Sequence, residues 1–397
     1  MRPPSLRHLP GPPGLNQRVP GQPVRKRWVS PKPLPANRPP LAKPAASPTP
    51  TSPRANPATN LLRAARAASP APTGPQAEAA TAGASVVKQK LLWVLLAGFL
   101  AVNAVAFLHA WRFTHFTDEP GSHTNSPEQL STLGKIEMLL TGIKNPKPCN
   151  VGVPAFAFCT VSIPSPTGKL EAWYGSVPKA KGCVALFHGY TSNKSKLLME
   201  AGVFRKLGYS VLLVDFAGNG GSDGFQTTVG FRESTDVAAA FAFLRRQQPV
   251  VPIILYGASI GAVAILRAES ELGVKPTAAI VECPYGSMLQ TAKNRFSSMH
   301  VPTFPLANLL VFWGGVQNGF WAFDLDATAF AHHVTTPTLL LWGAADPRVT
   351  RQETDVIYAA LRGPKQRRDF AGVGHEPYVH KYPAEWEATV AGFLRRQ

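Results

Sequence analysis

The chain has 397 residues, of which 45% are hydrophobic, and it carries a formal net charge of +18. The charge is uneven, because residues 1–85 contain twelve Lys and Arg and a single acid, Glu78. No nucleic-acid-binding motif accompanies this basic segment, which argues against nucleic acid as a partner. The four cysteines form no C-x-x-C pair, which argues against a zinc site.

Residues 1–85 are dense in Pro, Ala, Ser and Arg, and their one aromatic residue is Trp28. Such a segment cannot bury enough apolar surface to offset its chain entropy, so we expect a disordered tail. A basic tail can bind anionic lipid head groups, and a merely solvated tail is the alternative.

An uncharged stretch, Leu91–Ala110, follows the tail and matches the thickness of a bilayer core. Trp93 and Trp111 lie near its ends, as interfacial anchors do, and Asn103 is its one strongly polar residue. We expect a transmembrane signal-anchor over residues 88–111, with a buried core helix as the alternative. The cations before it predict a cytoplasmic N-terminus and an extracytoplasmic C-terminal part.

Residues 112–150 are predicted to form a stalk with one short amphipathic helix. Ser126 is its expected N-cap, the helix runs through Leu140, and Pro146 and Pro148 end it. Cys149 and Cys159 are close enough in sequence to pair in an oxidising compartment, which the sequence leaves open.

Residues 151–397 are predicted to form one α/β domain. Strands are expected at 156–161 and 170–175, separated by a turn from Pro164 to Gly168. From Cys183 onward strands and helices alternate, the pattern of a largely parallel sheet covered on both faces. Helices are expected at about 194–207, 231–247, 259–271, 351–362 and 384–395.

The segment Gly257-Ala258-Ser259-Ile260-Gly261 has the G-x-S-x-G pattern of a nucleophile elbow. An apolar strand, residues 251–256, precedes it, and a helical run, residues 262–268, follows. Such a tight strand-to-helix turn needs small neighbours, and it lifts the serine hydroxyl out of the sheet. Ser259 is therefore the candidate nucleophile.

A serine needs a base, and two later strand ends supply candidates. Asp346 follows the apolar strand 338–343, and His375 follows residues 366–370. We expect His375 to remove the Ser259 proton while Asp346 holds the imidazole in the right tautomer. The alternative for Asp346 is an N-cap for a helix from Val349.

Backbone amides are the expected oxyanion donors. One is the N–H of Ile260, directly after the nucleophile. The other is the N–H of Tyr190, because the apolar strand 183–187 ends in His188-Gly189-Tyr190. Losing one such donor typically costs on the order of 100- to 1000-fold in turnover.

These motifs resemble the α/β-hydrolase superfamily, in particular its serine aminopeptidase S33-like and Bem46-like groups. Residues 214–224 are similar to the D-x-R-G-x-G-x-S segment of those groups, with Ala217 where Arg is usual. The resemblance covers about residues 170–396. It implies a mostly parallel central sheet with helices on both faces, a small helical cap at about 285–330, and catalysis without metal or cofactor. His188 and Asp215 are expected to be structural.

The expected cap is rich in aromatic residues, among them Phe296, Phe304, Phe312, Trp321 and Phe320. They can line an apolar substrate pocket or pack the cap onto the core, and the sequence leaves both open.

The sequence thus predicts a membrane-anchored, esterase- or lipase-like serine hydrolase acting on an apolar or lipid ester. An aminopeptidase with Glu282 as the anchor for the substrate amine, a thioesterase and an acyltransferase are the enzyme alternatives. A membrane adaptor that uses its basic tail is the non-enzyme alternative.

Overall fold

The computed structural model of the protein describes residues 75–119, 121, 123, 124 and 130–397. Most of the predicted basic tail and the predicted N-cap Ser126 therefore lie outside the described residues.

A single sheet of eight strands organises the described domain, in the order β1-β2-β4-β3-β5-β6-β7-β8. Its strands are β1 Cys159–Ser165, β2 Gly168–Gly175, β3 Cys183–Phe187, β4 Ser210–Val214, β5 Ile253–Ala258, β6 Ala278–Glu282, β7 Thr338–Gly343 and β8 Lys365–Phe370. β2 is antiparallel to both of its neighbours, and all strand pairs from β4 to β8 are parallel. The predicted, mostly parallel sheet is confirmed.

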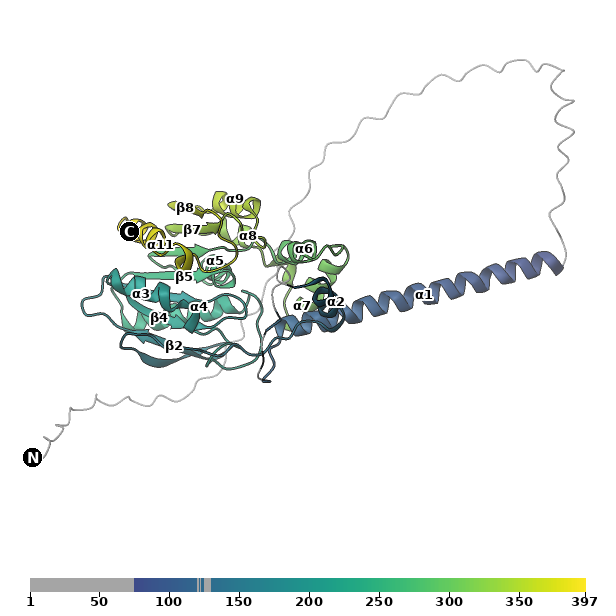
Figure 1. Ribbon diagram of the computed structural model, residues 1–397, viewed down its shortest axis with the longest axis horizontal. Helices are drawn as coiled ribbons and strands as arrows, with labels where there is room; N and C mark the ends of the chain where they lie inside the picture. Colours follow the sequence, from purple (N-terminus) through teal and green to yellow (C-terminus); the bar gives the residue numbers. More distant parts are fainter. Residues whose placement is uncertain (1–74, 120, 122, 125–129) are drawn as a thin grey trace, which may run out of the picture. The chain divides into compact units, whose positions relative to one another are not determined.

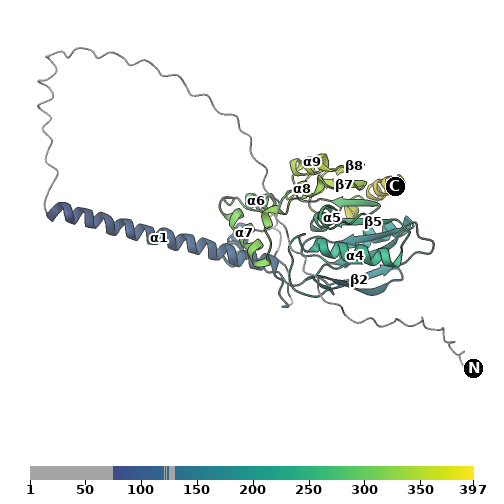
Figure 2. The same cartoon turned by 180° about the vertical axis from the view of Figure 1, so that it is seen from behind.

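Helices cover both faces of the sheet, as Figures 1 and 2 show from opposite sides. One face carries α3 Leu198–Lys206, α10 Tyr378–Lys381 and α11 Pro383–Leu394. The other carries α4 Glu233–Gln247, α5 Ile260–Glu271, α8 Ala327–Ala331 and α9 Arg351–Ala360. Strands β3 to β7 are buried on both faces, which is why their sequences are continuous apolar runs.

Two helices form a small cap between β6 and the segment that leads to β7. They are α6 Met288–Ser298 and α7 Leu306–Asn318, followed by the 3-10 turn η4 Ala322–Asp324. Ala292, Ala307, Val311 and Ala322 form a separate hydrophobic cluster inside this cap.

The apolar segment before the domain is one long helix, α1 Pro75–Thr114. Its start at Pro75 corrects the expectation of disorder for residues 75–85, where Ala-rich sequence favours helix. By length and composition residues 85–114 could cross a membrane. The large apolar side chains from Val86 to Leu100 are exposed.

Local boundaries differ from the predictions in three places. Helix α2 spans Thr132–Thr141, and its N-cap is Ser131, whose hydroxyl accepts from the Gly134 amide at 3.2 Å. Strand β1 begins at Cys159 and runs through Pro164, which is tolerated because β1 is the edge strand. The predicted helix 194–207 starts as the 3-10 turn η3 Lys194–Leu197 before α3.

The segment predicted as a stalk is bound to the domain. The Phe116 amide donates to the Phe225 carbonyl at 2.7 Å, and the Thr117 amide donates to the Asn145 carbonyl at 2.9 Å. The Asn145 side chain in turn donates to the Arg112 carbonyl at the end of α1, at 3.1 Å. The C-terminal end of α1 is therefore held against the domain.

Candidate active site

Ser259 occupies a strained turn between β5 and α5. Its φ of 53° and ψ of −112° are unfavourable for a residue with a side chain, and the surrounding structure must hold them. The Ser259 amide donates to the Glu282 carbonyl at 2.8 Å. A Cβ at Gly257 would lie 2.5 Å from the Gly261 carbonyl carbon, and one at Gly261 would lie 2.6 Å from the Phe187 carbonyl oxygen. Both glycines of the motif are required by close backbone contact.

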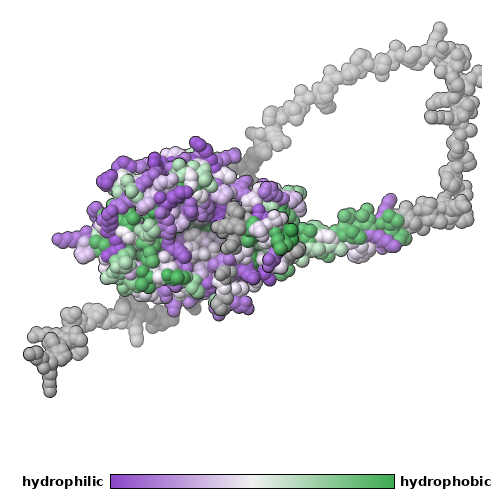
Figure 3. Space-filling view, in the orientation of Figure 1, coloured by the Kyte–Doolittle hydropathy of each residue, from purple (hydrophilic) through white to green (hydrophobic). Residues whose placement is uncertain are grey.

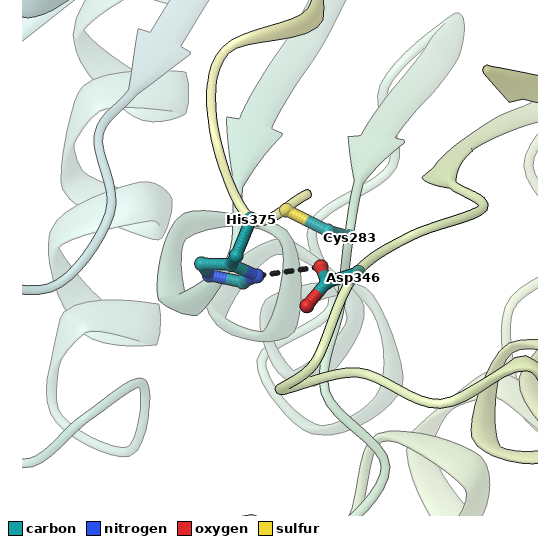
Figure 4. A group of neighbouring side chains, drawn as sticks. All are labelled: Cys283, Asp346 and His375. Atoms are coloured by element: carbon teal, nitrogen blue, oxygen red, sulfur yellow. Dashed lines mark hydrogen bonds and ion pairs between the residues drawn. The ribbon is translucent and has the colours of Figure 1, made fainter. Parts of the chain in front are cut away.

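His375 lies between Ser259 and Asp346. Its Nε2 is 3.1 Å from Ser259 Oγ, and its Nδ1 is 2.7 Å from Asp346 Oδ2 (Figure 4 shows the His375–Asp346 pair). The carboxylate accepts from Nδ1–H, so the neutral imidazole presents the Nε2 lone pair to the serine hydroxyl. This arrangement can transfer a proton from Ser259 to His375.

The Asp346 carboxylate is fully buried and held by two backbone amides. Its Oδ1 accepts from Arg348 N at 2.8 Å and from Val349 N at 3.0 Å. The N-cap of α9 is Thr350, in a capping box with Glu353, so Asp346 is not the cap of that helix. Asp346 instead fixes its own loop while its second oxygen orients His375.

Cys283 lies beside this pair, with its sulfur in the same cluster of potential metal ligands as Asp346 and His375 (Figure 4). Burial raises the pKa of the Cys283 thiol well above its usual value, so the thiolate that a metal needs is disfavoured. A cation here would also have to replace the His375–Asp346 hydrogen bond. The donor set therefore fits a proton-transfer site better than a metal site.

The two predicted oxyanion donors lie at one pocket with the nucleophile. Tyr190 and Ile260 line it together with Ser259 and His375. Among the described residues, no hydrogen bond from either backbone amide to a protein acceptor is found. His188 fixes the loop that carries Tyr190: its Nδ1 is 2.8 Å from the Gly189 carbonyl, and its Nε2 accepts from the Phe216 amide.

The pocket at Ser259 is mainly apolar. Besides the residues above, it is lined by Val229, Tyr285, Met288, Ala292, Leu310, Val311, Gly314, Phe320, Ala322 and Val349, with Ala110, Phe113, Thr114, Thr228, Thr291, Arg295 and Arg348. Helix α7 thus contributes Leu310, Val311 and Gly314. Three lining residues come from α1.

The contribution of α1 to this pocket was missed by sequence reasoning, which assigned the segment to an anchor and a stalk. The Phe113 ring stacks on the Tyr190 ring, with centroids 4.6 Å apart. The Tyr190 hydroxyl donates to the Phe113 carbonyl at 2.7 Å. No short-range pattern signals this pairing, because it joins segments 77 residues apart.

A second, more polar pocket adjoins the first and shares five residues with it: Phe113, Tyr190, Arg295, Leu310 and Arg348. Its polar lining consists of His109, His123, Thr124, Lys144, Asn145, Thr191, Arg295 and Arg348. The pocket at Ser259 is thus mainly apolar, and the pocket that adjoins it is lined by basic and hydrogen-bonding side chains.

Glu282 does not reach either pocket. It is buried, and its carboxylate accepts from the Trp386 indole and the Tyr256 hydroxyl, each at 3.1 Å. Burial raises its pKa to about 7. The suggestion that Glu282 anchors a substrate amine is therefore wrong, because its side chain belongs to the core beneath the site.

Asp215 also has a structural environment. Its carboxylate is fully buried, pairs with Lys194 and accepts from the Gly221 amide at 2.9 Å. Cys149 and Cys159, for which a disulfide was left open, are free thiols at exposed positions.

The sequence offered two roles for the cap aromatics, pocket lining or packing, and the structure adds a third, exposure on the surface. Phe320 lines the pocket and stacks on Phe231, with centroids 4.2 Å apart. Phe296 lines the second pocket and packs within the cap. Phe304, Phe312 and Trp321 are exposed, an outcome that neither sequence alternative included.

Comparison with known proteins finds relatives of the part of the chain that contains Ser259. The family model for serine aminopeptidase, S33, matches residues 178–318, which include Ser259 but end before Asp346 and His375. An uncharacterised Bacillus subtilis protein, YqkD, is 26% identical over 58% of this chain and 77% of its own length. The zebrafish (Danio rerio) lysophosphatidylserine lipase ABHD12 is 27% identical over 39% of this chain and 40% of its own.

A solved structure shares the fold. The Pyrococcus furiosus esterase Pf2001 superposes with a TM-score of 0.52 at 23% identity, covering 63% of this chain and 98% of the esterase. The order of the strands in the sheet, the nucleophile elbow at Ser259 and the match to the family model together define a serine hydrolase. The described domain has the α/β-hydrolase fold, and its residues 178–318 are similar to the serine aminopeptidase, S33, family.

Proposed function

We propose that the protein is a membrane-anchored esterase that cleaves a carboxylic ester with an apolar acyl part, through an acyl-enzyme on Ser259. The observation that carries the proposal is the hydrogen-bonded series Ser259–His375–Asp346, of which Ser259 and His375 line a mainly apolar pocket.

In the acylation step, Ser259 Oγ attacks the ester carbonyl carbon while His375 Nε2 takes the hydroxyl proton. The Tyr190 and Ile260 amides donate to the oxygen that becomes negative. When the C–O bond breaks, His375 returns the proton to the leaving alkoxide. The buried Asp346 carboxylate stabilises the imidazolium between these two events.

In the deacylation step, water replaces the alcohol. His375 removes a proton from the water as it attacks the acyl carbonyl, and then protonates Ser259 Oγ as the acid leaves. The net reaction consumes one water per ester and needs no cofactor.

Labelling with a fluorophosphonate tests the nucleophile. We expect covalent labelling of the wild type in detergent and none of Ser259→Ala, with His375→Ala strongly slowed. Ser270→Ala, which changes a serine away from the pocket on α5, should label like the wild type. Equal labelling of Ser259→Ala would refute the assignment.

The proposal that the apolar pocket binds the acyl part is tested with esters of different acyl chain length. Gly314 lines the pocket, and no atom lies within 4 Å of a Cβ built there. Gly314→Leu should therefore occupy pocket space and lower kcat/KM for a twelve-carbon p-nitrophenyl ester by about tenfold or more, since each lost methylene contact is worth about 1–3 kcal/mol. The butyrate ester should be little affected, and Gly202→Leu on α3 serves as the control.

A lysophospholipid is the more specific substrate class that we favour. Basic and hydrogen-bonding side chains line the second pocket, which adjoins the apolar one. ABHD12 is named as a lysophosphatidylserine lipase, and the chain covers 40% of its length. Release of fatty acid from lysophosphatidylserine should exceed release from a monoacylglycerol of equal chain length. Preference for a thioester or an aminoacyl amide would instead favour the thioesterase, acyltransferase or aminopeptidase alternatives.

We further propose that α1 anchors the enzyme with a cytoplasmic N-terminus and an extracytoplasmic hydrolase domain. The support is its uncharged stretch and the basic residues before it. The basic tail is proposed to contact anionic lipid head groups. Protease added to intact cells should degrade the hydrolase domain and spare an N-terminal epitope, and the opposite pattern would reverse the topology.

A further inference from the structure

Helix α7 of the cap is packed along the apolar part of α1. The Trp313 indole N–H donates to Asn103 Oδ1 at 3.2 Å, and the side-chain amide of Gln317 donates to the Phe107 backbone carbonyl at 2.7 Å. The Phe107 and Trp313 rings meet edge to face, with centroids 5.3 Å apart. Asn103 and Phe107 both lie inside the uncharged stretch, so the cap touches the segment predicted to span the membrane.

The depth of this contact follows from helix geometry. Arg112 is the first cation after the uncharged stretch, and Asn103 precedes it by nine residues. At a rise of 1.5 Å per residue, Asn103 lies about 13 Å and Phe107 about 8 Å along the axis from Arg112. If Arg112 is at the membrane surface, Trp313 and Gln317 are below it.

The sequence of α7 suits such a position. No Asp, Glu, Lys or Arg occurs from Val301 to Phe323. Phe312 and Val316 form an exposed stripe on α7, and Phe304 and Trp321 are exposed at its two ends. Phe312 directly precedes Trp313, and Val316 directly precedes Gln317. Because successive helical residues are rotated by about 100°, the exposed stripe lies about 100° around α7 from the face that contacts α1. Figure 3 shows hydrophobic surface on α1 continuing onto the adjoining part of the domain.

Asn103 has its polar groups satisfied within this pair of helices. Its amide nitrogen donates to the Phe99 carbonyl at 2.9 Å, and its oxygen accepts from Trp313. Polar side chains within a bilayer are expected to be paired in this way. Asn103, the strongly polar residue in the interior of the uncharged stretch, therefore binds the cap.

We propose that α7 is embedded in the outer part of the bilayer beside α1, and that the ester substrate reaches Ser259 from the bilayer. At 13 residues, or about 20 Å, α7 is too short to cross and lies in one leaflet. The same two helices line the pocket at Ser259, α1 through Ala110 and Phe113 and α7 through Leu310, Val311 and Gly314. This inference rests on the proposed anchoring by α1.

Site-directed spin labelling of the full chain in phosphatidylcholine vesicles tests the depth of α7. Cys149→Ser and Cys159→Ser remove the exposed thiols, while Cys183 and Cys283 are buried. Single cysteines then replace Val316 on α7, Val356 on α9 and Leu95 on α1, whose exposed fractions are 51%, 46% and 61%. Collision with lipid-soluble oxygen and with a water-soluble nickel chelate is measured at each label.

The label at position 316 should collide with oxygen and be protected from nickel, and the label at 356 should show the reverse. If the 316 label resembles the 356 label while the 95 label stays in lipid, the embedding of α7 is refuted and the anchor stands. If the 95 label is also exposed to nickel, the anchor itself fails. Protection of the 316 label from both reagents would mean that protein covers α7, which also overturns the proposal.

Activity tests the route of the substrate. Val316→Lys places a charge on the exposed stripe outside the pocket, and should lower hydrolysis of a vesicle-borne ester by about tenfold. Soluble p-nitrophenyl butyrate should be cleaved at the wild-type rate, which also shows that the variant is folded. Val356→Lys should change neither rate. Equal losses on both substrates, or no loss on vesicles, would overturn entry from the bilayer.

Discussion

Tyr190 binds the end of α1 through its side chain and lines the pocket that holds Ser259. Its hydroxyl donates to the Phe113 carbonyl at 2.7 Å and accepts from Asn145 Nδ2 at 3.2 Å. Burial raises the pKa of the Tyr190 hydroxyl, so it remains a donor. The proposed oxyanion donor and the proposed membrane anchor are thus connected by one residue.

Tyr190→Phe should keep the stacking on Phe113 and remove both hydrogen bonds. The partly buried Phe113 carbonyl and the Asn145 side-chain amide then each lose a partner, so we expect a loss of about 1–3 kcal/mol in the free energy of unfolding. Because the loop of the amide donor loosens, kcat should fall several-fold with little change in KM. Urea denaturation and ester kinetics measure the two effects. Tyr382→Phe, which removes an exposed bond to the Ala371 carbonyl, is the control, and equal behaviour of the two variants would contradict the coupling.

Asp346→Asn should lower kcat by on the order of 10⁴-fold while leaving the fold intact. An amide NH₂ facing His375 Nδ1 favours the tautomer with its proton on Nε2, which cannot accept the serine proton. Turnover of p-nitrophenyl butyrate measures the loss. Asp369→Asn changes a partly exposed carboxylate on β8 that pairs with Arg367, and should retain full activity. A loss below tenfold in Asp346→Asn would remove Asp346 from the proposed series.

Gly261→Ala should destabilise the protein by about 3 kcal/mol, because the added methyl meets the Phe187 and His188 carbonyl oxygens at 2.6 and 2.9 Å. Neither atom belongs to a side chain that can turn away. Gly202 on α3 has no atom within 4 Å of the same position, so Gly202→Ala should stabilise by about 0.5–1 kcal/mol. Thermal unfolding of the two variants should therefore shift in opposite directions, and a neutral Gly261→Ala would show that the elbow tolerates a side chain.

Much of the fold was predictable because its signals are local. The apolar runs of β3 and β5 to β7 and the small residues around Ser259 act over a few positions. The structure brings Ser259, His375 and Asp346 together because the carboxyl ends of parallel strands share one edge of the sheet. Their assigned roles remain predictions that the variants above test.

The surroundings of the site were less predictable, because they depend on non-local packing. Phe113 approaches Tyr190, and Trp313 approaches Asn103 from 210 positions away. The uncharged stretch was interpreted from its hydropathy alone, which describes a helix in lipid and carries no information on a protein partner. Asn103 was an available signal, since a polar residue in the interior of such a stretch calls for a partner.

Acids whose pKa is raised by burial should make stability depend on pH, and Glu200 is one of them. Glu200 on α3 is buried, its Oε2 has no hydrogen-bond partner among the described residues, and burial together with nearby Glu282 raises its pKa to about 8. Folding thus favours the protonated acid, and the folded protein binds more protons than the unfolded chain between the ordinary pKa of 4.5 and about 8. The free energy of unfolding should therefore be highest at the acid end of this window and fall as pH rises through it.

Glu200→Gln removes one of these ionisations, so its stability should fall less with pH than that of the wild type, while Asp236, Glu269 and Glu282 still titrate. Relative to the wild type, it should gain on the order of 2 kcal/mol at pH 9 and little at pH 5. Urea denaturation followed by tryptophan fluorescence from pH 5 to 9 measures this difference. Glu137→Gln on the exposed face of α2 should follow the wild-type curve. Parallel curves for Glu200→Gln and the wild type would show that Glu200 is already ionised in the folded protein.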